Sequence, residues 1–160
     1  MDISTHKGTA IQQCSGLQLL NDCLMCKLIS KSEENPLFIV RLEHGSVFLH
    51  KNQSYLGRCI FIFNQHYDNI ADVEKYIFMN ASAELQKVCG IVSSVFDSDL
   101  INIAMLGNQQ RHLHWHIIPR YKDDHNWGKP PWPSQSLLLD SQKYLILVET
   151  LRKSLFWRIK

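Results

Sequence analysis

Three histidines alternate with apolar residues late in the chain. The run reads His112-Leu113-His114-Trp115-His116-Ile117-Ile118. Successive side chains of a β-strand point to opposite faces, so a strand here would place the three imidazoles on one face and most of the apolar side chains on the other. At ~3.3 Å per residue the three imidazoles would cover about 13 Å. A helix would spread them around its axis, and the alternation with strongly apolar residues therefore favours a strand.

A row of imidazoles can support two kinds of chemistry. Neutral imidazole is the commonest metal-binding side chain, so alternate histidines could hold an ion. Imidazole also titrates near neutral pH, so the same residues could act as nucleophile and acid–base groups. The chain has only eight histidines, and three of them stand at a spacing of two. A functional interpretation therefore outweighs that of ordinary surface or core histidines.

The cysteines form a second set with chemical potential. The chain has five of them, at positions 14, 23, 26, 59 and 89. The number is odd, and the polar segment at residues 1–13 lacks the apolar stretch of a secretion signal. A disulfide framework is therefore not expected, and free thiols or a metal site are the better interpretations.

The elements that must position these residues are short strands and two helices. Apolar and β-branched runs predict strands at residues 37–42, 46–50, 59–63, 100–106 and 112–121. Apolar residues at steps of three and four predict a long helix between Asp72, its expected N-cap, and Phe96, and a second stripe from Tyr144 to Leu155 predicts a C-terminal helix. Short loops containing glycine or asparagine favour antiparallel neighbours. We expect a single α+β domain at residues 14–160, with a mostly antiparallel sheet and a polar tail at residues 1–13.

Composition narrows the class of protein. A chain of 160 residues that is 45% hydrophobic and 20% charged fits one globular domain and excludes disordered, collagen-like and coiled-coil classes. The net charge of +2 is too small and too evenly spread to indicate nucleic-acid binding. No apolar run approaches the ~20 residues that span a bilayer. We therefore expect a cytoplasmic protein with neither a nucleic-acid nor a membrane partner.

The histidine row resembles the His-φ-His-φ-His-φ-φ signature, where φ is apolar, of the histidine triad (HIT) superfamily of nucleotide hydrolases and transferases. Gly107-Asn108 before the row is similar to the family's Gly-Gln, and Pro119-Arg120 after it to the family's Pro-Arg. The segment at residues 49–66 is similar to the family's order of loop, Gly-His, strand and Pro-Lys-x-His. With Cys23-x-x-Cys26, the resemblance extends to about Trp132 and is to bacterial-type hydrolases of the diadenosine polyphosphate hydrolase kind.

The resemblance implies a role for four residues at the reacting phosphate. His114 is the middle histidine, which in this family attacks the α-phosphorus and forms a nucleotidyl-histidine that water cleaves. His116 would contact the α-phosphate or the bridging oxygen. Asn102 and Asn108 would donate amide hydrogens to phosphate, although a strand-edge hydrogen bond and a turn position explain these two asparagines equally well.

The resemblance also implies a metal site. Cys23, Cys26, His66 and His112 match the positions that bind zinc in the Cys-x-x-Cys members, and two cysteines with two histidines are a normal structural zinc set. The alternative is a pair of thiols without metal, with His66 and His112 serving the phosphate site.

Three positions depart from the family pattern. Gly57-Arg58 replaces the usual Gly-His, Asn64-Gln65 replaces Pro-Lys, and the loop near His50 lacks the acidic or amide residue that many members place at the ribose. Nucleoside recognition is therefore expected to differ. Arg58 is either an extra phosphate contact or, as the preferred interpretation, a solvated charge.

These observations predict a nucleotide hydrolase or nucleotidyl transferase. It would cleave a phosphoanhydride or phosphoramidate bond at the α-phosphate of a nucleotide, with dinucleoside polyphosphates as first choice and a homodimer as the family's typical assembly. Two alternatives belong to other classes. One is a nucleotide-binding regulatory module of the same fold with little turnover, and the other is a metal-binding protein that uses all three histidines of the row.

Overall fold

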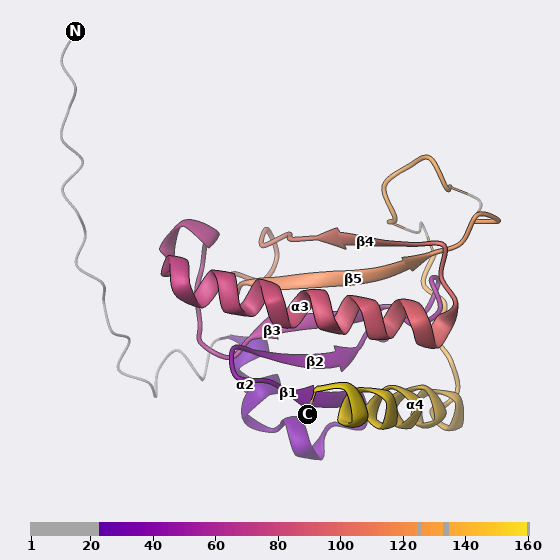
Figure 1. Ribbon diagram of the computed structural model, residues 1–160, viewed down its shortest axis with the longest axis horizontal. Coiled ribbons are helices and arrows are strands. Elements are labelled where there is room, and N and C mark those ends of the chain that lie inside the picture. The colour runs from indigo at the N-terminus through magenta and orange to yellow at the C-terminus, as the bar shows by residue number, and fades with distance from the viewer. Residues whose placement is uncertain (1–22, 125, 133–134, 160) are drawn as a thin grey trace, which may run out of the picture.

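One antiparallel sheet organises the protein. The computed structural model describes residues 23–124, 126–132 and 135–159 (Figure 1). The strands are β1 (Phe38–Arg41), β2 (Gly45–Leu49), β3 (Cys59–Phe63), β4 (Leu100–Ala104) and β5 (His114–Arg120). They lie in the order β1-β2-β3-β5-β4, and every neighbouring pair is antiparallel. The predicted α+β class with an antiparallel sheet is confirmed.

Three helices of the described residues cover the two faces of the sheet. They are α2 (Leu24–Ser30), α3 (Lys75–Phe96) and α4 (Ser141–Ile159), with 3-10 turns η1 (Ser32–Glu34) and η2 (Ile70–Asp72). Figure 1 shows α3 and α4 side by side across one face, where they enclose the main core. The shorter α2 packs a smaller apolar cluster against the other face. No helix in the described part of the chain is both long enough and apolar enough to cross a membrane.

The pleat of β5 separates its two kinds of side chain. Trp115 and Ile117 belong to the main core beneath α3 and α4. His114 and His116 lie on the opposite face, because they pair with Ile62 and Ile60 of β3, and Ile62 belongs to the cluster beneath α2. Strand geometry thus places these two histidines together on a buried sheet surface.

Two predicted boundaries need correction. The strand begins at His114, so the predicted start at residue 112 is wrong and His112 lies just before the strand, although Leu113 still packs in the main core with Trp115 and Ile117. The backbone N–H of Leu113 donates to the Tyr67 carbonyl at 2.8 Å, which ties this stretch to the segment after β3. Asp72 is not the N-cap of α3. It ends η2, and the helix starts after Glu74 without a side-chain cap. The predicted tail at residues 1–13 and Cys14 lie outside the described residues.

Gly57 occupies a turn that only glycine fits. Its φ is +85°, and a Cβ built on it would lie 2.3 Å from the ring of Phe96. We expect Gly57→Ala to lower the free energy of unfolding by about 2–3 kcal/mol, because it adds both backbone strain and overlap. Gly90→Ala, where a Cβ would meet nothing within 4 Å, is the control and should raise it by about 0.5–1 kcal/mol. Urea denaturation measures both, and equal stabilities would contradict the prediction.

Candidate active site

His114 is held with one ring nitrogen free for chemistry. Its Nδ1 lies 2.6 Å from the backbone carbonyl oxygen of His112. A carbonyl oxygen only accepts hydrogen bonds, so Nδ1 carries the hydrogen and Nε2 keeps its lone pair. The side chain is 4% exposed. This arrangement supplies the fixed tautomer that a nucleophilic imidazole requires.

Two pockets of similar size meet at His114. One has a volume of about 490 Å³ and the other about 480 Å³. Leu106, Asn108 and His114 line both. The first pocket also carries Asp68 and Arg111. Asn108, one of the two predicted amide donors, therefore lies next to the space that a phosphate bound at His114 would occupy.

The second pocket has a charged and aromatic wall. His50, Arg58, His116 and Trp132 line it. The His116 ring centroid lies 5.1 Å from that of His114, 5.7 Å from that of His50 and 5.5 Å from that of Trp132. The Nδ1 atom of His116 is buried and has no hydrogen-bond partner among the described residues. His116 thus has an unsatisfied ring nitrogen beside the second pocket.

Burial and Arg58 keep two of these imidazoles neutral. Burial first, then the positive charge of Arg58, lowers the pKa of His116 to about 3. The same two causes, in the same order, lower the pKa of His50 to about 4. Both rings are therefore uncharged at neutral pH and available as hydrogen-bonding groups.

Removing the charge of Arg58 should be visible in the titration of His116. We expect Arg58→Met to raise the pKa of His116, because a nearby positive charge disfavours the imidazolium. The pKa should stay below the ordinary 6.5, since burial, the larger cause, is retained. NMR titration of the ring measures this, and Lys87→Met on exposed α3 surface is the control. An unchanged pKa in Arg58→Met would rule out this electrostatic link.

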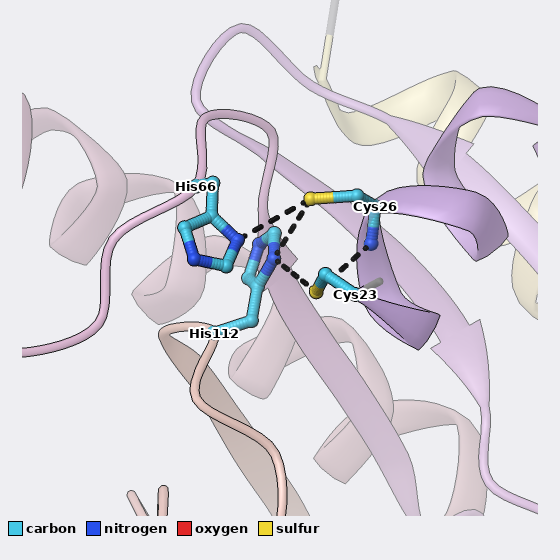
Figure 2. A group of neighbouring side chains, drawn as sticks. All are labelled: Cys23, Cys26, His66 and His112. Atoms are coloured by element: carbon cyan, nitrogen blue, oxygen red, sulfur yellow. Dashed lines mark hydrogen bonds between the residues drawn. The ribbon is translucent and has the colours of Figure 1, made fainter. Parts of the chain in front are cut away.

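Cys23, Cys26, His66 and His112 form a second cluster beside the pockets (Figure 2). One ligand atom from each residue lies within 4.8 Å of all the others. The Sγ of Cys26 lies 3.3 Å from Nδ1 of His66 and 3.4 Å from Nδ1 of His112, and the Sγ of Cys23 lies 3.4 Å from the same His112 atom. These separations are close to the edges of a tetrahedron around an ion with ~2.0–2.3 Å bonds.

The surroundings of this cluster also suit a metal. Nε2 of His66 lies 3.1 Å from Oδ1 of Asp68, and Nε2 of His112 lies 2.7 Å from the Phe63 carbonyl. Such contacts place the ring hydrogen on Nε2 and aim the Nδ1 lone pair at the thiols. Burial, followed by the Cys23 thiol, raises the pKa of Cys26 to about 12, so a thiolate here needs a cation. The four residues could therefore bind a metal ion.

The fold explains why these ligands meet. Cys23 is the N-cap of α2, and its Sγ accepts a hydrogen bond from the Cys26 backbone N–H, so both thiols lie at one helix end. His66 follows β3 and His112 precedes β5, and these two strands are neighbours. The cluster thus joins α2 to the sheet.

Asn102 is placed differently from Asn108. Its Oδ1 accepts a hydrogen bond from Nη1 of Arg120 at 2.7 Å, and it lines neither of the two pockets as far as the structure describes them. Arg120 is 2% exposed, pairs with Asp124 at 2.7 Å and donates to the carbonyls of Asn126, Trp127 and Lys129. It fixes the start of the loop that brings Trp132 to the second pocket.

Sequence reasoning missed part of this site. Arg58 is 4% exposed, so its interpretation as a solvated charge is wrong. His50 and Trp132, which line the second pocket, are not among the site residues that the sequence predicts. The signal that could have found Arg58 was its position one residue before the buried strand β3. The metal interpretation with the whole histidine row also fails, because His114 and His116 join no possible ligand group among the described residues.

A family model described as HIT domain matches residues 31–123, more than half of the chain. The chain belongs to the HIT family. Members of this superfamily are generally nucleotide hydrolases or transferases.

Two curated relatives share this HIT character. The adenylylsulfatase HINT3 of Arabidopsis thaliana is 26% identical over 144 residues, which cover 87% of this chain and 72% of the relative. An uncharacterized HIT-like protein of Methanocaldococcus jannaschii is 27% identical over 106 residues, which cover 64% of this chain and 81% of the relative.

Solved HIT structures have the same fold. A histidine triad protein from Bradyrhizobium japonicum aligns with a TM-score of 0.68 and 26% identity over 78% of this chain and 94% of that one. A zinc-bound histidine triad family protein from Mycobacterium smegmatis aligns with a TM-score of 0.66 and 19% identity over 86% of this chain and 95% of that one.

Proposed function

We propose that this HIT protein transfers or hydrolyses nucleotidyl groups through covalent catalysis at His114. One observation carries the proposal: Nδ1 of His114 is tied to the His112 carbonyl at 2.6 Å, which leaves Nε2 as the ring nitrogen for attack in a residue that lines both pockets. This is the ring orientation and tautomer that an imidazole nucleophile needs.

The reaction follows in two steps. Nε2 of His114 attacks the α-phosphorus, a P–N bond forms, and the bond from phosphorus to the leaving group breaks with its electron pair on the leaving group. Water then attacks the nucleotidyl-histidine, the P–N bond breaks, and the monophosphate leaves with the imidazole restored. His116, which has an unpartnered Nδ1, and the amide of Asn108 supply hydrogen bonds to oxygens that gain charge in both steps.

We propose a dinucleoside polyphosphate as the preferred substrate. Two pockets of about 490 and 480 Å³ meeting at the nucleophile offer one compartment for the nucleotide that is transferred and one for the leaving nucleotide. Phosphoramidates and phosphosulfates are the smaller alternatives. A regulatory module with little turnover remains the second candidate function, and the changed residues at Arg58 and near His50 favour it.

We propose zinc for the cluster formed by Cys23, Cys26, His66 and His112. All four protein ligands are present, which is typical of a structural ion, and the ion would stabilise the fold without taking part in phosphoryl transfer. We further propose a cytoplasmic homodimer built from one domain at residues 14–160 with a tail at 1–13. β4 supports the dimer, since it is an edge strand with half-exposed Leu100 and Ile103.

A substrate panel tests the function. Purified protein is incubated with dinucleoside polyphosphates of different lengths, nucleoside phosphoramidates and adenosine 5′-phosphosulfate, and release of nucleoside monophosphate is followed by chromatography. Turnover with a preference for dinucleoside polyphosphates is expected. Absence of turnover on the whole panel, with nucleotide binding intact, would reject the enzyme in favour of the regulatory module.

A further inference from the structure

Arg58 is a buried cation without an anionic partner among the residues that line its pocket. Its side chain is 4% exposed, and its Nε has no hydrogen-bond partner among the described residues. No carboxylate lines the pocket that it shares with His50, His116 and Trp132, within the described part of the chain. Its guanidinium lies 5.3 Å from the ring centroid of Trp132, a cation–π contact that supplies neither a hydrogen-bond acceptor nor a formal negative charge.

The neighbours of Arg58 do not compensate its charge. His50 and His116 are kept neutral by burial and by Arg58 itself, so neither supplies a negative charge. Burial also lowers the pKa of the guanidinium, which is the direction expected for a desolvated cation. By contrast, the positive charge of Arg120, another buried arginine, is compensated by the carboxylate of Asp124.

An unpaired buried cation destabilises a fold, and proteins rarely keep one without a ligand. Arg58 has no structural acceptor for its Nε, although its backbone extends the pairing of β2 with β3: the His50 N–H donates to the Arg58 carbonyl at 2.9 Å. The buried Nδ1 of His116, which lines the same pocket, is also unpartnered. Two orphan polar groups therefore border one pocket, and an oxyanion would satisfy the guanidinium in a planar, two-pronged fashion.

Arg58 and His114 occupy different parts of the site. Arg58 lines only the second pocket, whereas His114 lines both. Arg58 faces Trp132 at 5.3 Å, and the His116 ring lies 5.5 Å from that of Trp132 and 5.1 Å from that of His114. An anion at Arg58 is therefore a different group from the phosphate attacked by His114.

We propose that Arg58 binds a second oxyanion of the substrate, a phosphate or sulfate group carried in addition to the phosphate attacked by His114. The proposal rests on the proposed function for the identity of the first phosphate. It makes Arg58 a specificity residue that favours nucleotides with two anionic groups over those with one. The second group could belong to the leaving group or to the nucleoside, and the probes below distinguish the two sources.

Binding calorimetry on the intact protein tests this without turnover. The probes are AMP, ADP and adenosine 3′,5′-bisphosphate. We expect one of the two doubly phosphorylated probes to bind more tightly than AMP, and Arg58→Met to reduce that preference by about 10-fold or more, as for loss of a charge-assisted contact. Preference for ADP assigns the second oxyanion to the leaving-group side, and preference for the 3′,5′-bisphosphate assigns it to the nucleoside.

Matched variants separate charge from shape. Arg58→Gln keeps a hydrogen-bond donor without the charge and should lose the preference as Arg58→Met does, and it replaces that variant if the methionine form does not fold. Lys87→Met removes one exposed positive charge on α3 and should keep the wild-type preference. If neither uncharged Arg58 variant changes the ratio of affinities, or if all three probes weaken equally, the proposal is wrong.

Stability gives a second, independent readout. Because removing an unpaired buried charge relieves its desolvation, Arg58→Met should raise Tm by about 2–4 °C. A large fall in Tm for both uncharged variants would show that Arg58 serves the fold and would overturn the proposal. A wild-type protein that turns over no substrate yet shows the Arg58-dependent preference would reject the enzyme function and support the oxyanion site. Turnover without that preference would support the enzyme function and reject the oxyanion site.

Discussion

Replacing His114 with alanine is expected to lower kcat/KM by about 10⁴-fold or more on the best substrate of the panel. The reason is that no other described side chain presents a tautomer fixed by a main-chain carbonyl to both pockets. Without Nε2, water must attack the phosphorus directly, and the covalent route is closed. Initial rates of monophosphate release over a range of substrate concentrations measure the effect.

His116→Ala is the matched comparison for this experiment. It removes a neighbouring imidazole of the same strand face but leaves the nucleophile, so a loss of about 10²-fold is expected. Rapid quenching with a substrate labelled at the α-phosphate should trap labelled protein in wild type and none in His114→Ala. Equal losses in the two variants, with labelled protein in both, would exclude His114 as the nucleophile.

Cys26→Ser is expected to abolish tight zinc binding and to lower Tm by about 10 °C or more. Cys26 contacts both histidines of its cluster, at 3.3 and 3.4 Å, and the cluster joins α2 to the ends of β3 and β5. Metal binding of this kind adds directly to folding free energy, so its loss should cost several kcal/mol. Elemental analysis and calorimetric melting measure the two effects.

Cys89→Ser provides the control. Cys89 is a partly buried cysteine that packs against the main core and belongs to no possible ligand group in the described residues. It should keep about one zinc per chain and melt within a few degrees of wild type. Zinc retained in full by Cys26→Ser would remove this cysteine from the ligand set, and a protein purified without zinc but equally stable would remove the structural role of the ion.

The regular parts of this fold could be predicted because their patterns are local. Alternation along residues 114–117 places His114 and His116 on one face of the strand and Trp115 and Ile117 on the other. Pairing with β3 then puts both histidines on the same surface of the sheet. The stripe of α3 is equally local, since steps of three and four follow from helix geometry. Local sequence patterns were therefore sufficient to predict the sheet, the long helices and the place of His114 on a strand.

The remaining features depend on contacts between distant segments. Alternation continues through His112 in the sequence, yet β5 begins only at His114, because the Leu113 N–H bonds the Tyr67 carbonyl in the segment after β3. The burial of Arg58 depends on Trp132, which a loop held by Arg120 brings across from beyond β5. No spacing rule in the sequence encodes contacts between such distant segments. Charge alone predicts that an arginine side chain is exposed.

The hydrogen bond from His114 to the His112 carbonyl has a consequence for how the site tolerates change. Every amino acid carries a main-chain carbonyl, so the orientation of the nucleophilic ring does not depend on the side chain at position 112. That side chain instead faces the two thiols. One residue thus serves two sites through separate atoms. Substitution at position 112 would remove one proposed metal ligand but not the carbonyl that fixes the tautomer of His114, the proposed nucleophile, so the two proposed sites can vary independently.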